Sequence, residues 1–278
     1  MGMVSSGVEG AMLISYETYG PVFVPVDYQH LVIKSESAKV YHTGDKSVIF
    51  TDIERLGEEV GSENQFIPCA EIQLVTDGEF VRIHDAGCRS KLIGLGKNTT
   101  VDYHLYADNL HDYAKTMSDN LVFMAGDKSR VNVDNFSFKD SIAISLGEGS
   151  ELYLAESSYP ENDYSNNIAF SAGDHSSTTI GSSSTVFNSG DENYIYAIDQ
   201  TDVVAVTTGK NTNIELGVDS LILSSENLRA FSLGKDSCAA IVWHDGTRKR
   251  VKVVYESEDG IVANKLYKLD ANGNVIAA

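Results

Sequence analysis

The chain is poor in several residue types, and each shortage excludes a class of protein. Its 278 residues include only three cysteines, four prolines and one tryptophan. The cysteines (Cys69, Cys88 and Cys238) are odd in number and form no Cys-x-x-Cys pair, so we expect reduced thiols and no disulfide framework. No apolar run approaches the roughly 18–20 residues that a membrane-spanning helix needs, which predicts a protein that does not act in a membrane.

Basic residues are scarce as well. Lys and Arg number 21 against 40 Asp and Glu, which gives a formal net charge of −19. Such a chain does not offer the basic patch that usually binds nucleic acid, so we expect no direct nucleic-acid binding. Residues 1–16 contain no Lys or Arg and only a short apolar stretch at 11–14, which does not fit a secretory signal. These features predict a protein of the cytoplasm, or of a particle assembled there.

The sequence does contain a short recurring motif: Gly, two variable residues, then Ser or Thr. It begins at Gly44, Gly96, Gly126, Gly147, Gly173, Gly181, Gly209, Gly217 and Gly234. Alternating apolar stretches flank most copies, for example residues 142–146 before Gly147 and 152–154 after it. The pattern predicts a strand, a tight corner at which Gly supplies a positive φ, and a further strand.

The spacing of this motif predicts the architecture. The interval from Gly173 to Gly190 equals the interval from Gly217 to Gly234, and Gly181 follows Gly173 by about half of it. Two corners in each coil of about 17 residues describe an all-β fold: a two-sheet β-solenoid (a β-helix or roll) with a thin core. The alternative is a β-sandwich with Gly-rich hairpins, which does not require one corner formula to recur.

Three regions are predicted along the chain. Residues 1–90 are less regular and are expected to form a β-rich N-terminal cap or lead-in, with a short helix over 51–60. Residues 91–240 are expected to form the solenoid, with polar, Tyr-rich loop excursions at 103–119 and 156–167. Residues 241–278 alternate around Asp245–Gly246 and Asn272–Gly273, which predicts a C-terminal β-meander covering the open end of the solenoid.

Two stretches resemble known repeat proteins. The unit Ser232-Leu-Gly-Lys-Asp-Ser-Cys-Ala-Ala240 resembles the Ser-x-Gly-x-x-Ser-x-Ala units of phage and prophage β-solenoid proteins, and also the head repeats of trimeric autotransporter adhesins. The tail, from Ile241-Val-Trp-His-Asp-Gly246 to Leu266-Tyr-Lys-Leu269, resembles the W-x-D-G β-meander cap of uncharacterised phage-encoded repeat proteins. Leu266 stands where that module usually has Trp. The resemblance implies a phage or prophage origin, and hence the host cytoplasm or the virion, and it supplies no catalytic residue.

Candidates for catalysis and metal binding are few. None of the seven histidines forms an HExxH motif or a Cys/His cluster with zinc spacing, and the densest group is His104 and His111 with Asp108 and Asp112. Cys88 beside Arg89 is the one candidate for an activated thiol. We expect no catalytic residue, no metal and no cofactor, so the protein is predicted not to be an enzyme.

The leading functional hypothesis is a non-enzymatic interaction protein that occupies the basic surface of a host or phage protein. It would inhibit a DNA-handling or defence protein by nucleic-acid mimicry. About ten coils at ~4.8 Å span roughly 50 Å, over which duplex DNA carries about 30 charges, the order of the −20 on residues 1–244. The acidity is equally compatible with a role in solubility. The candidate partner-binding residues are the corner acids Asp127, Glu148, Asp174 and Asp191.

Three alternatives accompany this hypothesis. The first is a virion tail or decoration protein in which the solenoid forms a homotrimer, an assembly that needs an apolar outer face. Apart from this hypothesis, a homo-oligomer, either a dimer or a trimer, is also expected as an option. The second is a sponge for a small nucleotide-like ligand, held by the excursion residues Tyr103, Tyr106, His111 and Tyr113. The third is a carbohydrate-active β-helix enzyme that uses rows of acids. Mass in solution tests the first alternative, and thermal shifts with nucleotides test the second.

Overall fold

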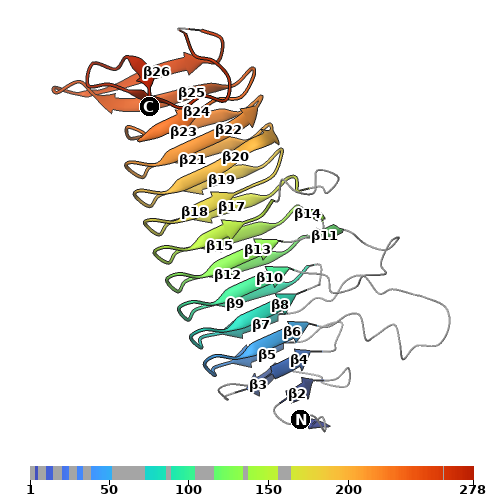
Figure 1. Cartoon of the computed structure of the whole chain (residues 1–278). Coiled ribbons are helices and arrows are strands. Elements are labelled where there is room, and N and C mark those ends of the chain that lie inside the picture. Colours follow the sequence, from blue (N-terminus) through green and yellow to red (C-terminus); the bar gives the residue numbers. More distant parts are fainter. Residues whose placement is uncertain are drawn as a thin grey trace.

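The chain folds into two large β-sheets that run side by side along one axis (Figure 1). The computed structural model describes residues 4–5, 11–14, 21–24, 30–33, 39–51, 73–85, 89–103, 116–133, 137–155, 164–258 and 260–278. Every regular element in these ranges is a strand, and two sheets of 14 and 12 strands contain all but one strand pair. The prediction of an all-β solenoid is confirmed.

The two sheets are named A and B. Sheet A consists of β1 (Val4–Ser5), β2 (Ala11–Ile14), β4 (His30–Ile33), β6 (Val48–Thr51), β8 (Arg82–Asp85), β10 (Thr100–Tyr103), β13 (Arg130–Val133), β16 (Glu151–Tyr153), β18 (Ser177–Thr179), β20 (Tyr194–Thr201), β22 (Asn213–Val218), β24 (Ala230–Ser232), β27 (Tyr267–Leu269) and β28 (Val275–Ala277). Sheet B consists of β3 (Pro21–Val24), β5 (Lys39–His42), β7 (Gln73–Thr76), β9 (Lys91–Gly94), β12 (Leu121–Met124), β15 (Ile142–Ser145), β17 (Ile168–Ser171), β19 (Thr185–Asn188), β21 (Val204–Thr207), β23 (Leu221–Ser224), β25 (Cys238–His244) and β26 (Lys249–Tyr255). The remaining pair is β11 (Thr116–Ser118) with β14 (Ser137–Lys139).

Each coil places one strand in sheet B and the next in sheet A, so every strand of the coils pairs in parallel with its counterpart one coil away. Ile168 lies beside Thr185, and Leu221 lies between Val204 and Cys238, so these three coils have the equal length that the glycine spacing predicts. The coil from Lys91 to Leu121 is longer because twelve residues outside the described ranges, 104–115, lie between β10 and β11. The predicted repeat length is therefore that of the coils without excursions.

The solenoid begins before residue 91, which corrects the predicted boundary. In sheet B, β7 pairs in parallel with β5 on one side and with β9 on the other. In sheet A, β8 pairs in parallel with β6 and with β10 in the same way. The four-residue strands of residues 39–85 therefore belong to the same two sheets. The predicted helix over 51–60 lies outside the described residues, apart from Thr51 on β6.

The corners that lead from sheet B to sheet A explain why glycine recurs, and the reason is not the predicted one. The residue with a left-handed backbone is the third residue of the Gly-x-x-Ser/Thr motif, as at Lys128 (φ 56°) and His175 (φ 55°). Its N–H points along the solenoid: Lys128 N donates to Glu148 O at 2.8 Å in the next coil. The first residue must be Gly because a Cβ on Gly173 would lie 1.9 Å from Gly147 O. Consecutive coils form one glycine column here: Gly44, Gly78, Gly96, Gly126, Gly147, Gly173, Gly190 and Gly209.

The corners that lead from sheet A to sheet B carry a column of buried polar side chains. The Ser141 Oγ accepts a hydrogen bond from Asn120 N at 3.1 Å, and the Asn167 Oδ1 accepts one from Ser141 N at 3.1 Å. Ser184 Oγ continues the series by accepting from Asn167 N at 2.9 Å. The last position of these corners is polar, with or without a Gly three residues earlier, because its side chain satisfies a backbone N–H of the neighbouring coil that would otherwise be buried without a partner.

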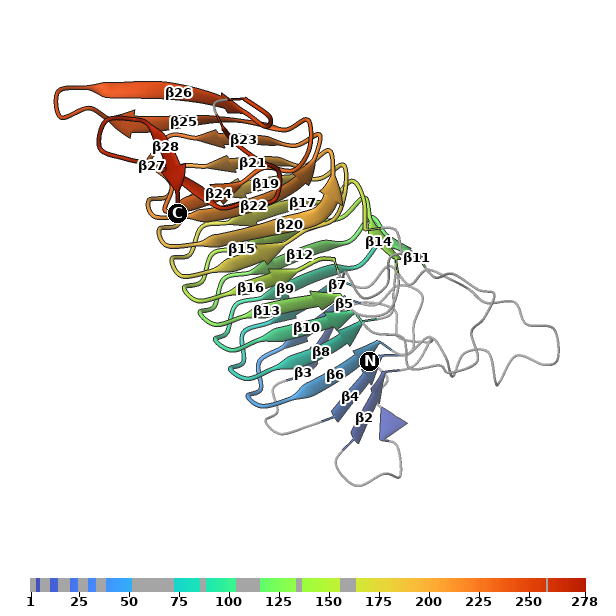
Figure 2. The same ribbon diagram turned by 45° about the horizontal axis from the view of Figure 1, so that its top comes forward.

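The C-terminal residues close the solenoid with antiparallel strands. Strand β26 folds back on β25, with Trp243 opposite Arg250, and β27 pairs antiparallel with β24 and β28 (Figure 2). Gly273 lies between β27 and β28 at a φ of 77°, directly against the Trp243 ring. The meander therefore packs against the last coil through the only Trp of the chain.

Replacing Gly273 with alanine should loosen this meander while the coils remain folded. A Cβ at this position would lie 2.3 Å from Trp243 Cζ2, and the positive φ adds strain for any residue other than Gly. We expect a loss of about 2 kcal/mol in local stability. Trp243 fluorescence measures this local stability directly: the first unfolding transition of the variant should move to lower urea concentration.

The variant Gly246→Ala separates backbone strain from the clash, because φ is 90° there and no atom lies within 4 Å of the new Cβ. Equal shifts for both variants would contradict the role given to Trp243.

Candidate functional site

The four predicted partner-binding acids do lie together, along one edge of the solenoid. Asp127, Glu148, Asp174 and Asp191 each occupy the second position of a B-to-A corner, and these corners belong to four consecutive coils. Three of the four carboxylates serve the fold. Asp127 Oδ1 accepts from Glu148 N at 3.2 Å, Asp174 Oδ1 from Asp191 N at 2.7 Å, and Asp191 Oδ1 from Lys210 N at 2.7 Å. The column is a structural ladder on an exposed edge.

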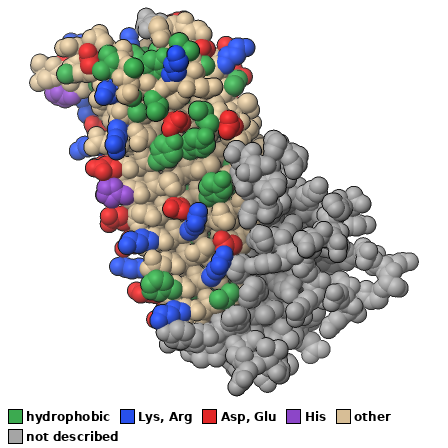
Figure 3. Space-filling model, viewed as in Figure 1, with side chains coloured by type: hydrophobic (Ala, Val, Ile, Leu, Met, Phe, Trp, Pro, Cys, Tyr) green, Lys and Arg blue, Asp and Glu red, His purple; other side chains and the backbone are tan. Residues whose placement is uncertain are grey.

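Basic side chains alternate with these acids. Lys97 Nζ lies 3.4 Å from Asp127 Oδ2, and Lys128 and Lys210 occupy the same edge. Figure 3 shows side chains of both charges following one another along it. The described residues contain 18 Lys and Arg and 23 Asp and Glu, a net charge of −5, so −14 of the total lies outside them. The described coils therefore do not have the charge density on which mimicry of DNA was argued.

The predicted ligand-binding residues are only partly placed. Tyr103 is the last residue of β10 rather than part of a loop, and its side chain is fully buried. Its ring packs against Phe138 with the centroids 5.0 Å apart. Tyr103 is thus a core residue and not a loop residue open to a ligand, since its inward position on the strand follows from the alternation of β10. Tyr106, His111 and Tyr113 lie outside the described residues.

The outer face of sheet B is the most unusual surface of the described part of the chain. From β12 to β25, the first and third residues of each strand point outwards, and the parallel registers stack them in two rows. We call this surface, with its continuation onto β9 and β26, the apolar face; its side chains are Ile93, Leu121, Phe123, Ile142, Ile144, Ile168, Phe170, Phe187, Val204, Val206, Leu221, Leu223, Cys238, Ala240, Val253 and Tyr255. Between β12 and β25, Thr185 is the one polar side chain in the two rows; on β9, the exposed Lys91 continues the row beside Leu121. Ile142, Ile168 and Phe187 remain 40%, 42% and 41% exposed, so nothing in the described chain covers this face.

Charged side chains border the apolar face on both sides. The B-to-A edge carries the mixed ladder described above. The A-to-B edge carries aspartates at the left-handed corner positions: Asp119, Asp140, Asp202, Asp219 and Asp236. An apolar centre with a charged rim is the usual organisation of a protein–protein interface.

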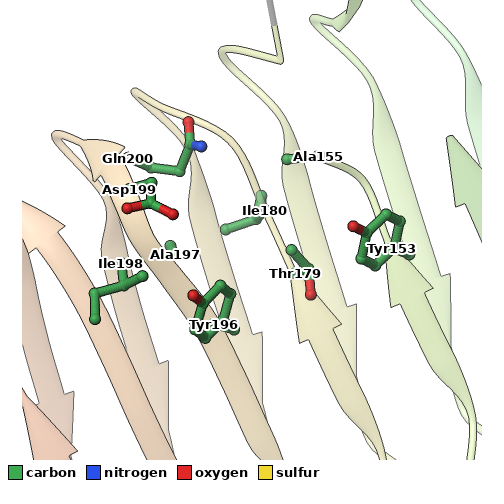
Figure 4. A pocket seen from close by; sticks show the side chains of 9 residues that line it. All are labelled: Tyr153, Ala155, Thr179, Ile180, Tyr196, Ala197, Ile198, Asp199 and Gln200. Atoms are coloured by element: carbon green, nitrogen blue, oxygen red, sulfur yellow. The ribbon is translucent and has the colours of Figure 1, made fainter. Parts of the chain in front are cut away.

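A shallow, open hollow lies on the outer face of sheet A (Figure 4). It is lined by Tyr153, Ala155, Thr179, Ile180, Tyr196, Ala197, Ile198, Asp199 and Gln200. Nearby, Tyr194 donates a hydrogen bond to Glu215 Oε1, and burial followed by this hydrogen bond raises the pKa of Tyr194. Burial and then the negative charges of Asp199 and Glu215 raise the pKa of Tyr196, so both phenols stay protonated at neutral pH.

The described residues offer neither a metal-binding cluster nor a membrane-spanning helix. No group of three or more His, Cys, Asp or Glu side chains in these ranges is arranged to hold a metal ion. No helix long and apolar enough to cross a membrane occurs among them either.

Sequence reasoning missed the apolar face, although a signal was present. In stretches such as residues 142–144 and 204–206, the two outward positions are apolar as well as the inward one between them. Alternation of apolar and polar residues would mark a face open to water, whereas a continuous apolar run marks a strand covered on both faces.

Comparison with protein-family models, curated proteins and solved structures gave no match, so function is inferred from the chain's own geometry.

Proposed function

We propose that the protein is a non-catalytic assembly protein that acts as a homodimer, in which the apolar faces of two copies pack against each other. The observation that carries this proposal is the uninterrupted apolar surface from β12 to β25, which lacks a charged side chain in seven successive strands. Surfaces of monomers rarely keep such a patch exposed, because large exposed apolar areas are sites of association.

The size of the face is sufficient for a stable pair. Nine strands at ~4.8 Å and four residues at ~3.3 Å give a flat projection of roughly 500 Å², and the corrugated accessible area is larger. Stable complexes bury about 800 Å² on each partner. Because the face is almost wholly apolar, removing it from water contributes a favourable free energy to association that grows with the area buried.

The chemistry of the face favours a second copy over an unrelated partner. Interfaces between different proteins are about as polar as the rest of the surface, whereas homodimer interfaces are more apolar. A flat face is covered completely by one other flat face, while three such faces around an axis would meet only along their borders. Two copies therefore bury the face better than the three of a trimer.

Salt should distinguish assembly from mimicry. Both rims of the apolar face carry an excess of Asp and Glu, so two copies bring like charges together at their borders. Screening weakens that repulsion, and the apolar contact itself does not depend on screening. Dimerisation is expected to strengthen as salt rises, whereas binding of an acidic mimic to a basic protein weakens steeply.

Sedimentation equilibrium over a range of protein concentrations tests the proposal. The full chain should have twice the monomer mass at micromolar concentration. Phe187→Asp, in the centre of the face, should weaken dimerisation at least about 100-fold, because it buries an unpaired carboxylate. Thr100→Asp adds the same charge to the outer face of sheet A, between Arg82 and Arg130, and should leave the dimer intact.

Three results would contradict the proposal: a monomer at every concentration, a mass of three chains, or a dimer that survives Phe187→Asp. Cys238 offers a readout independent of mass, since it is half-buried and lies within the apolar face. In a variant with Cys69 and Cys88 replaced by serine, its labelling by a maleimide should slow as protein concentration rises. A labelling rate that does not change with concentration would count against burial of this face.

A further inference from the structure

One coil departs from the regular repeat on the sheet A side. The coil from Thr185 to Val204 is two residues longer than the coils immediately before and after it, and the departure lies in β20. Ala197 pairs with Leu216 and Thr201 with Val218, so three residues of β20 lie opposite the single residue Gly217 of β22. This bulge accounts for the extra length. Bulges occur beside functional sites because they redirect side chains that a regular strand would hold in register.

The bulge completes the hollow on sheet A (Figure 4). Tyr153, Thr179 and Tyr196 stand in one row on neighbouring strands, with the small Thr179 between the two rings. Two strand spacings separate the tyrosines by about 9.6 Å, which leaves room for one ring-shaped group above Thr179. Ala155, Ile180 and Ala197 are buried and form the floor. Asp199 and Gln200, from the bulge, lie farther along β20 than Tyr196, at one end of the hollow.

The polar groups at this end are suited to hydroxyl groups. Gln200 Oε1 accepts a hydrogen bond from Ser182 Oγ at 3.1 Å, and Ser182 Oγ itself accepts one from Thr201 N at 3.1 Å. These bonds orient the amide of Gln200 beside the exposed carboxylate of Asp199. A carboxylate accepts hydrogen bonds from two adjacent hydroxyls, and an amide both donates and accepts.

Charge around the hollow restricts the class of ligand. Asp199 lines it, and Glu215 lies beside Tyr196 in the next strand. Phosphates, nucleotides and acidic sugars would meet this negative charge, whereas a neutral molecule would not. A ring with apolar C–H faces and a rim of hydroxyls matches two tyrosine rings, a carboxylate and an amide better than a purely apolar molecule does.

We infer that this hollow, formed by Tyr153, Thr179 and Tyr196 with Asp199 and Gln200 of the β20 bulge, binds a neutral pyranose sugar. The tyrosines contact the C–H groups of the sugar ring, and Asp199 and Gln200 bind neighbouring hydroxyls. Because the site is shallow and open, a single sugar unit should bind with a dissociation constant in the millimolar range. This site is on the sheet opposite the apolar face, so it does not depend on the proposed dimer.

Saturation-transfer NMR on the full chain tests the site with four probes: the methyl glycosides of glucose, galactose, mannose and N-acetylglucosamine. At least one should receive magnetisation from the protein, chiefly at its ring C–H protons. Tyr196→Ala should weaken its binding at least about tenfold, since it removes one of the two aromatic surfaces that contact the sugar ring. Asp199→Asn keeps the size of the side chain and removes the charge, and should weaken binding by a similar factor.

A matched control lies on the other sheet. Tyr41→Ala removes a tyrosine that is 41% exposed on the outer side of β5, outside the apolar face, and should leave sugar binding unchanged. The inference is overturned if none of the four glycosides binds, if Tyr196→Ala and Asp199→Asn bind as the natural chain does, or if adenosine binds while the sugars do not. Loss of binding in the Tyr41→Ala variant would likewise overturn this location of the site.

Discussion

Gly173→Ala is expected to be among the most destabilising single substitutions in the solenoid. The new Cβ would lie 1.9 Å from Gly147 O and 2.4 Å from Gly147 C, where real Cβ atoms are not found. The neighbouring coil cannot retreat, because β15 and β17 are joined by a four-residue parallel register next to this corner. We expect a loss of at least about 4 kcal/mol in the free energy of unfolding, or failure to fold. Urea denaturation followed by far-UV circular dichroism measures it.

Gly149→Ala provides the matched control. Gly149 has a φ of 64°, but a Cβ there meets only Lys128 Cγ at 3.7 Å, an ordinary contact. Alanine at this position should cost only about 1–2 kcal/mol, the strain of a left-handed backbone. If Gly173→Ala were no more costly than Gly149→Ala, the glycine column would be explained by backbone conformation and the close approach of the coils would be irrelevant.

Asn167→Ala is expected to have the second largest effect. The side chain is fully buried, and its Oδ1 accepts from Ser141 N at 3.1 Å. Its Nδ2 donates to Phe138 O at 2.9 Å and to Tyr164 O at 3.1 Å. Alanine would leave three buried backbone groups without these partners, each worth about 1–3 kcal/mol. We expect a loss of roughly 3–5 kcal/mol in thermal or urea unfolding.

Two variants refine this prediction. Asn167→Ser places at this corner the residue that the neighbouring coils have at Ser141 and Ser184, and it can still accept from Ser141 N. It should recover part of the loss. Asn213→Ala, on the outer face of sheet A, should change stability by less than about 0.5 kcal/mol. A small effect of Asn167→Ala would show that water can replace the side chain inside the corner.

Much of the fold could be predicted from the sequence because the repeating unit is local. A single coil contains a strand, a corner and a second strand, so its pattern is visible in a short stretch of sequence. Two equal Gly–Gly intervals were sufficient to predict a solenoid. The acids at Asp127, Glu148, Asp174 and Asp191 could be assigned to corners for the same reason. Their stacking in one column follows from the repeat, but their bonds to the next coil do not, since those depend on contacts between residues a whole coil apart in the sequence.

The candidate sites were less predictable because each depends on which way a strand faces. Tyr103 was expected in a loop, yet it points into the core because β10 continues to include it. The hollow on sheet A has one sequence signal, a coil slightly longer than its neighbours, and its residues come from three coils. Only the parallel register places Tyr153 and Tyr196 on either side of Thr179.

The sequence by itself determined that the chain is all-β, that it coils with two corners per turn and that its corners are polar. These properties depend on residue spacing and on the conformational preferences of a few residues. Only the tertiary structure decided why the glycines are required, where the first coil begins and which apolar residues face outwards. Those properties depend on the atoms that the next coil places a few ångströms away, and stacking along the axis turns single exposed residues such as Phe170 and Phe187 into one continuous surface.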